Sequence, residues 1–270
     1  MNGALRQVFS NRWFRVLAPA AVGMLFLCGW EGIVRWYEIP PYILPSPVLV
    51  GETLWTDGGS LVGSLWITLR VTAVAFASAV ILGVLIAVLF SQSRLLETSL
   101  FPYAIALQVT PVVSIAPLII VWTRGDYFLA LLICAWIVAF FPVVANTTLG
   151  LRSVDRNLAA LFRLYGASRW QILRHLQLPT ALPFFLAGAR ISGGLALVGV
   201  VVSEFVAETG GAETGLAARI LEASYRLEIA REMAALVLLS LSGITIYFVL
   251  DGISRLLLSH WHESVLPADD

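Results

Sequence analysis

Long apolar stretches dominate this chain and restrict the folds that are open to it. A transmembrane helix needs about 20 mostly apolar residues to cross roughly 30 Å of hydrocarbon. Six stretches meet this requirement, and they cover residues 16–37, 71–90, 104–122, 127–149, 184–203 and 233–250. The first contains Glu31 and the fifth contains Arg190 near its start, but both are long enough to span. The pattern predicts about six membrane-spanning helices.

The composition supports the same class. Hydrophobic residues make up 59% of the 270 residues, and charged residues make up only 13%. Soluble domains contain about 25% charged residues, so a single water-soluble core of this size could not bury so much apolar sequence. We therefore expect an all-α membrane protein whose transmembrane domain covers residues 16–258.

Arginine supplies every basic residue, because the chain contains no lysine. A Walker A phosphate loop needs a lysine that reaches the nucleotide phosphates, so any ATP used by this protein must bind another chain. Most of the arginines fall on one side of the predicted topology, at Arg6, Arg12, Arg15, Arg94, Arg152, Arg156, Arg163, Arg169, Arg174 and Arg255. Cytoplasmic segments are enriched in basic residues, which predicts that both termini (1–15 and 259–270) and segment 151–183 are cytoplasmic.

Two further segments are then predicted to be outer loops. Loop 39–63 begins with four prolines and should start extended and rich in turns. Loop 204–232 should contain a Gly-rich turn at 209–215, followed by an amphipathic helix.

Segment 151–183 combines five arginines with apolar residues at intervals of three and four on either side of Gly166. This spacing predicts two short amphipathic helices. Ser153 or Asp155 can cap the first helix, and Gly166 can take the left-handed conformation that ends it.

The second helix of this segment has its own boundary signals. Ser168 and Gln171 have the spacing of a capping box, and Pro179 and Pro183 are expected to stop the helix before the next span. The helix pair could lie on anionic lipid, as basic amphipathic segments do, or it could dock a cytoplasmic partner. The residues alone leave these two alternatives at about equal weight.

The order of residues in this segment resembles the EAA loop of the binding-protein-dependent ABC importer permeases. That loop reads Glu-Ala-Ala, three residues, Gly, nine residues, Ile-x-Leu-Pro, and here Gly166 is followed by Leu176-x-Leu178-Pro179. The resemblance implies a coupling helix that inserts into a groove on an ATPase subunit. The implied coupling residues are Ala160, Leu161, Phe162, Gly166, Ala167, Ser168, Leu176, Leu178 and Pro179.

The resemblance extends over about residues 44–255 and is similar to the nitrate/sulfonate/taurine branch of these permeases. Its motifs include Leu44-Pro45-Ser46-Pro47, Thr68-Leu69-Arg70-Val71, Phe141-Pro142, Gly188-x-Arg190-Ile191 and Ser203-Glu204. One departure is clear, since Ala160-Leu161-Phe162 stands where the family has Glu-Ala-Ala. A carboxylate contact with the ATPase is therefore not expected.

The resemblance implies a type I importer permease in the bacterial inner membrane, which is a channel subunit and not itself an enzyme. Its expected partners are an ABC ATPase subunit that binds ATP and Mg, a second permease copy, a periplasmic solute-binding protein and membrane lipid. The chain itself is expected to bind no cofactor, metal or nucleic acid. Sulfonates, nitrate, taurine, pyrimidines and other vitamin precursors all remain possible substrates.

Candidate pathway residues lie in and around the third span. Pro111 and Pro117 are expected to interrupt it, and broken helices line many transport pathways, although a packed kink is an equal alternative. The full candidate set is Gln108, Thr110, Pro111, Ser114, Pro117, Asn146 and Glu204. Glu204 and Glu208 lie at the outer end of the fifth span, and for each we favour a structural ion pair over a role in transport or gating. Arg190 is expected to extend to the interface as an anchor.

One alternative function belongs to another class. An ion-coupled secondary transporter could use Glu204 as a proton or cation site, but such transporters commonly contain internal repeats. The first three and last three predicted spans show no convincing self-similarity. A membrane-embedded enzyme has no support either, because the spans contain no Ser/His/Asp set and no metal-ligand cluster.

Overall fold

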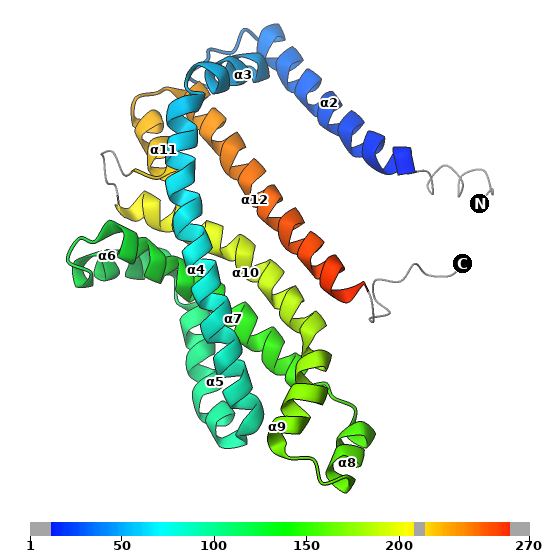
Figure 1. The fold of residues 1–270 in the computed structure, drawn as a ribbon. Helices are drawn as coiled ribbons and strands as arrows, with labels where there is room; N and C mark the ends of the chain where they lie inside the picture. Colours follow the sequence, from blue (N-terminus) through cyan, green and yellow to red (C-terminus); the bar gives the residue numbers. More distant parts are fainter. Residues whose placement is uncertain (1–11, 208–213, 260–270) are drawn as a thin grey trace. The chain divides into compact units, whose positions relative to one another are not determined.

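A computed structural model describes the backbone of residues 12–207 and 214–259. In order along the chain, its elements are α2 (Arg12–Trp36), α3 (Pro47–Thr56), α4 (Gly58–Gln92), α5 (Arg94–Val109), α6 (Val112–Trp122), α7 (Tyr127–Arg152), α8 (Arg156–Leu164), α9 (Arg169–Ile172), the π-helical turn η1 (Leu173–Gln177), α10 (Leu178–Ala207), α11 (Leu216–Tyr225) and α12 (Ile229–Leu258) (Figure 1). The described residues contain no strand. The all-α prediction is confirmed. Glu208, most of the predicted Gly-rich turn and most of both predicted terminal segments lie outside the described residues.

Five uninterrupted helical stretches are long and apolar enough to cross a membrane, and a bent helix pair is a candidate sixth. The predicted stretches 16–37, 71–90, 127–149, 184–203 and 233–250 each fall within one of the five, apart from Val16 and Tyr37 at the ends of the first. The stretch 104–122 does not form one helix. It is divided between α5 and α6, whose axes differ by 99°.

The break between α5 and α6 occurs at Thr110 and Pro111, which both have extended backbone conformations. Pro111 was expected to interrupt this stretch, and the structure confirms it. Pro117 was expected to do the same, and that prediction is wrong because α6 continues through it.

The predicted outer loop 39–63 is more helical than expected. Turns follow Pro40 and Pro41, and then Pro47 begins α3, where its missing N–H costs nothing. The Ser46 hydroxyl accepts a hydrogen bond from the Leu49 N–H at 3.3 Å and so caps this helix. The last six residues of the predicted loop already belong to α4.

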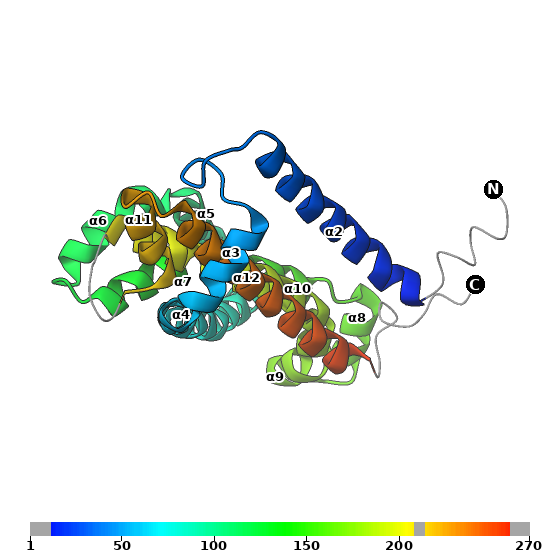
Figure 2. The same ribbon diagram turned by 90° about the horizontal axis from the view of Figure 1, so that it is seen from above.

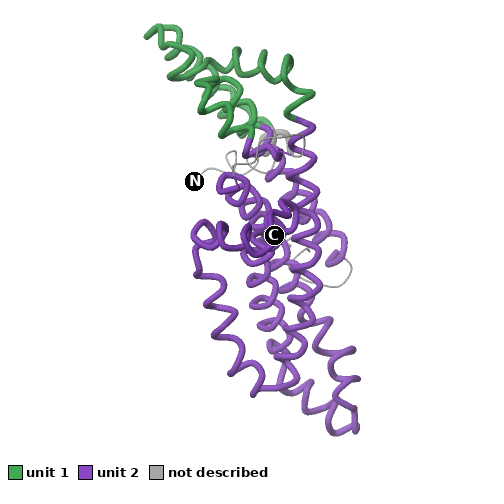
Figure 3. Tube along the Cα trace, turned by 90° about the vertical axis from the view of Figure 1, so that its left-hand side faces the viewer, with its two compact units in different colours: residues 1–61, 219–237 green, residues 62–218, 238–270 purple. Residues whose placement is uncertain are grey.

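The chain divides into two compact units (Figure 3). The first contains residues 1–61 and 219–237, and the second contains residues 62–218 and 238–270. In the second unit, α7 packs along α10 (Figures 1 and 2). Gly199 and Gly188 let the two backbones approach, since an added Cβ would lie 2.7 Å from the Ala135 Cα and the Pro142 carbonyl oxygen, respectively. Such small-residue contacts are typical of helix packing in lipid.

Candidate functional site

The corner between α8 and α9 is built by local hydrogen bonds. The Asp155 carboxylate caps α8 by accepting from the N–H groups of Asn157 (2.7 Å) and Leu158 (3.1 Å). At the other end Gly166 has a φ of 73°, as predicted. The Ala167 N–H donates to the Phe162 carbonyl oxygen, which completes a Schellman motif.

The capping box that opens the second helix is also present. The Ser168 N–H donates to the Gln171 side-chain oxygen at 2.7 Å, and the Gln171 N–H donates to the Ser168 hydroxyl at 3.3 Å. These two reciprocal bonds satisfy donors that a helix N-terminus otherwise leaves free. The sequence prediction for this turn is confirmed.

The second helix does not stop at Pro179, so that prediction is wrong. The helical path runs from Arg169 to Ala207 without a break. The π-helical turn η1 precedes the proline, and the Leu178 N–H donates to the carbonyl oxygen of Leu173, five residues back. Pro179 then falls in the first turn of α10, and Pro183 lies inside that helix. The wider turn accommodates a residue that would otherwise break the helix.

The corner exposes large apolar side chains. Leu164 and Tyr165 are each 84% exposed, and Trp170 is 65% exposed. The structure places the predicted coupling residues in three groups: Ala160, Leu161 and Phe162 on α8, Gly166, Ala167 and Ser168 at the corner, and Leu176, Leu178 and Pro179 at the η1–α10 junction. Leu176 is buried, so it stabilises the junction and does not belong to the exposed surface.

Glu204 is fully buried near the end of α10 and accepts three hydrogen bonds. The Thr68 hydroxyl of α4 donates to it at 2.8 Å, and the N–H groups of Ala217 (2.8 Å) and Ala218 at the start of α11 also donate. Thr68 in turn accepts a bond from the Leu216 N–H at 2.9 Å. We call these residues, Thr68, Glu204 and Leu216–Ala218, the Glu204 cluster.

The prediction that Glu204 forms an ion pair is wrong. No cation lies within salt-bridge distance of its carboxyl group among the described residues, and the N-terminus of α11 takes the place of one. Residue 215, which precedes α11, must be glycine, because a Cβ there would overlap the carboxyl group of Glu204. Thr68 and Gly215 were not predicted as site residues, although Thr68 belongs to the Thr68-Leu69-Arg70-Val71 motif.

The predicted pathway residues do not form one cluster. One group lies on both sides of the α5–α6 bend and consists of Gln108, Thr110, Pro111, Ser114 and Pro117. Within it, the Thr110 hydroxyl donates to the Ala106 carbonyl oxygen of α5. Asn146 lies on α7, where its side-chain amide donates to the Pro142 carbonyl oxygen at 2.8 Å. Among the described residues, no hydrogen bond joins either group to Glu204.

The family model described as "Binding-protein-dependent transport system inner membrane component" matches residues 79–262. The chain belongs to this family. It is similar to the riboflavin transport system permease protein of Chloroflexus aurantiacus, with 36% identity over 89% of this chain and 88% of the relative. It is also similar to the formylaminopyrimidine transport permease protein of Halalkalibacterium halodurans, with 29% identity over 92% of this chain and 97% of the relative.

The fold agrees with a solved structure. The inward-facing methionine ABC transporter MetNI contains a chain that superposes with a TM-score of 0.63 and 23% identity, over 72% of this chain and 94% of that chain. The protein is therefore a permease subunit of an ABC importer and a multi-pass inner-membrane protein. This assignment favours the importer over the ion-coupled secondary transporter.

Arg190 of this permease has a role that the sequence did not predict. Its guanidinium pairs with Asp251 of α12 at 3.0 Å and lies 5.8 Å from the Tyr247 ring centroid. Arg255 pairs with the same carboxylate at 2.8 Å. The expectation that Arg190 is an interfacial anchor stays a prediction; the structure adds that its guanidinium joins α10 to α12 through an ion pair.

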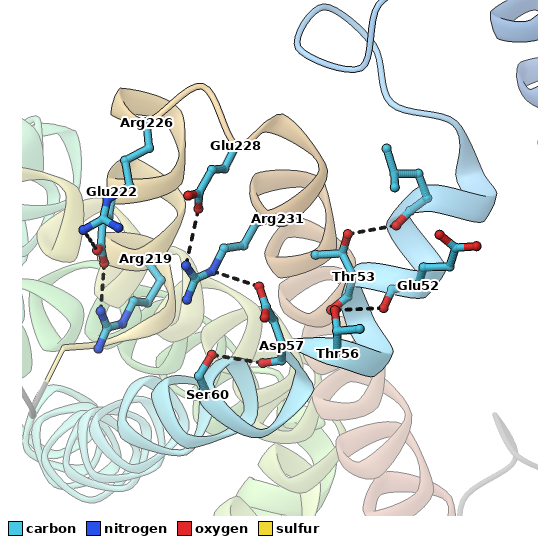
Figure 4. Close-up of polar contacts among 11 residues, drawn as sticks. Glu52, Thr53, Thr56, Asp57, Ser60, Arg219, Glu222, Arg226, Glu228 and Arg231 are labelled. Carbon is cyan, nitrogen blue, oxygen red and sulfur yellow. Dashed lines mark hydrogen bonds and ion pairs between the residues drawn. The ribbon is translucent and has the colours of Figure 1, made fainter.

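The first unit of the permease contains a group of ion pairs (Figure 4). Arg231 at the start of α12 lies 3.5 Å from Asp57 and 3.4 Å from Glu228. On α11, Glu222 pairs with Arg219 and Arg226 at 2.8 Å each. The hydrogen bond from Arg219 lowers the pKa of Glu222 below its ordinary value.

Proposed function

We propose that the α8–α9 corner docks an ABC ATPase subunit and transmits its movement to the membrane helices. The observation that carries this proposal is the exposed apolar surface of Leu164, Tyr165 and Trp170, presented by a corner of defined geometry. Exposed aromatic and aliphatic side chains of this kind are typical of protein interfaces.

Docking at this corner depends on apolar insertion more than on charge. Ala160, Leu161 and Phe162 provide no carboxylate where the family has one. Leu161 is 45% exposed, so it can contribute to the inserted surface. A partner groove lined by apolar side chains fits this surface best.

The importer then requires three further components. A second permease copy completes the channel, the ATPase subunits bind ATP and Mg and hydrolyse the ATP, and a solute-binding protein delivers the solute at the opposite face. The arginine distribution supports a cytoplasmic location for both termini and for the α8–α9 corner. Closure of the ATPase pair would move the two corners and change which side of the membrane the channel opens to.

We infer that the solute is a small nitrogen heterocycle of the vitamin type. This inference is supported by the two relatives, whose names specify riboflavin and formylaminopyrimidine. Equilibrium binding of both compounds to the cognate solute-binding protein would test it, with taurine and nitrate as controls. Binding of taurine or nitrate alone would contradict the inference without affecting the coupling proposal.

The substitution Gly166→Val tests the coupling role. A Cβ at this position would meet no atom within 4 Å, so the strain comes from the positive φ alone, which a β-branched residue resists. We expect loss of ATPase co-purification and of ATP-dependent uptake, with normal membrane insertion. Gly166→Asn is the matched control, because asparagine tolerates the left-handed conformation.

Two results would contradict the coupling proposal. The first is a Gly166→Val permease that binds the ATPase and transports normally. The second is equal loss of binding in the valine and asparagine variants, since that would show that the conformation at residue 166 does not control docking.

A further inference from the structure

A groove of about 580 Å³ runs between α4, α10 and α12 in the second unit. Its walls are almost wholly apolar, with Ala73 on α4 and Val249 and Ile253 on α12 among them. All three side chains are exposed, so no part of the described chain covers them. A groove of this volume is large enough for a small-molecule or acyl-chain ligand.

One charged side chain lines this groove, and it is Arg70 of α4. The guanidinium carbon lies 5.3 Å from the Phe128 ring centroid, which is a cation–π contact. Within the described part of the chain, no carboxylate lies within salt-bridge distance of Arg70. An ionised residue within a membrane span is costly unless it is paired, so an anionic partner at this position would be stabilising.

Trp66 places this end of the groove relative to the bilayer. It also lines the groove, is 68% exposed, and lies one helical turn before Arg70, toward the Gly58 end of α4. Tryptophan side chains concentrate at the membrane–water interface. The groove therefore has a polar end at the level of lipid headgroups and an apolar remainder at the level of acyl chains.

We propose that this groove is a specific site for an anionic phospholipid. The phosphate pairs with the Arg70 guanidinium, whose planar N–H groups fit phosphate oxygens in a bidentate arrangement. One acyl chain lies between α4 and α12 along Ala73, Val249 and Ile253. The leaflet is the one that faces the Gly58 end of α4.

A second copy of the chain is the main competing occupant. A packed helix would have to place a carboxylate opposite Arg70 as well as fill an apolar groove. A phospholipid provides both features in one molecule, with the charge at one end and the chain beyond it. The groove has one cation, Arg70, at one end and an apolar wall beyond it, and this arrangement matches the headgroup and acyl chain of a phospholipid.

Native mass spectrometry of the full chain in detergent tests the proposal, with equimolar palmitoyl-oleoyl phosphatidylglycerol and phosphatidylcholine added. We expect preferential retention of phosphatidylglycerol. Arg70→Gln should lower that retention about fivefold, which corresponds to about 1 kcal/mol for one arginine near the surface. Arg70→Lys should retain part of the preference because it keeps the charge.

A second pair of variants tests the apolar part of the site. Ala73→Trp should fill the groove and lower retention of both lipids, whereas Leu85→Trp, on another face of α4, should not. Equal retention of the two lipids by the unaltered chain would overturn the proposal. So would an Ala73→Trp variant that loses dimer formation but binds lipid normally, since the groove would then be an interface between copies.

Discussion

Replacement of Thr68 by valine removes the hydroxyl that links three elements of the Glu204 cluster. That hydroxyl donates to the Glu204 carboxyl group at 2.8 Å and accepts from the Leu216 N–H at 2.9 Å. Valine keeps the shape of the side chain, so the change removes two buried hydrogen bonds without creating a cavity. A buried group that loses a partner costs about 1–3 kcal/mol. The Leu216 N–H loses its acceptor, whereas Glu204 keeps its donors on Ala217 and Ala218 and so falls at the low end of that range, which gives about 2–4 kcal/mol in total for Thr68→Val.

Hydrogen exchange in the first turn of α11 measures this cost directly. The N–H groups of Leu216 and Ala217 are protected by Thr68 and Glu204. A loss of 2–4 kcal/mol should raise their exchange rates by roughly 30-fold to 1000-fold if the turn opens locally. Exchange followed by mass spectrometry on the purified permease, at the peptide that contains residues 216–218, reports the change.

Thr72→Val is the matched control for this measurement. Thr72 is buried one turn farther along α4, and its hydroxyl donates to the carbonyl oxygen of Thr68, within the same helix. Its loss should change exchange at residues 216–218 by a small factor only. Equal effects of the two substitutions, or no effect of Thr68→Val, would refute the assignment of the cluster as the attachment of α11 to α10.

Two further predictions concern packing and charge. Gly188→Ala and Gly199→Ala should each destabilise the permease by about 1–3 kcal/mol in thermal unfolding, because the added Cβ would lie 2.7 Å from α7 backbone atoms. Gly194→Ala, which meets no atom within 4 Å, should be neutral or stabilising by up to about 1 kcal/mol, and equal destabilisation by all three would contradict the packing argument. Arg219→Gln should raise the pKa of Glu222 toward its ordinary value in a ¹³C NMR titration. Because the pKa of Glu222 is lower in the folded protein than in the unfolded chain, the pair stabilises the fold at pH values above the unfolded pKa. This stabilisation is lost as the pH falls through the folded-state pKa. The contribution stays under about 1 kcal/mol at this partly exposed site, and an unchanged pKa would show that Arg219 is not the cause.

The sequence predicted the α8–α9 corner well because its signals are local. Asp155, Gly166, Ser168 and Gln171 act on backbone groups within five residues of themselves. The length of the second helix was predicted wrongly for a related reason. Pro179 usually ends a helix, but the π-helical turn before it changes the register, and no residue pattern in that turn indicated it.

The role of Glu204 could not be predicted in the same way, because its partners are distant in the sequence. Thr68 lies 136 positions away and Ala217 lies 13 positions away. A buried carboxyl group at the end of an apolar helix needs a compensating partner, and the sequence predicted an ion pair. The N-terminus of a short helix provides it instead, since free N–H groups and the helix dipole together favour a carboxyl group there.

Glu204 is held by hydroxyl and N–H donors where an ion pair was predicted, and this changes what it can contribute to transport. A carboxyl group that cycles protons or cations must exchange its partners with water or an ion, but this one is fully buried and its bonds join α4, α10 and α11. Removal of Thr68 would take one of three donors from Glu204 and would leave the Leu216 N–H without its side-chain acceptor, so the bonds of the cluster support one another. Glu204 therefore fits a structural attachment of α11 to the membrane helices. If an element of this region moves during transport, the first turn of α11 should move together with α10.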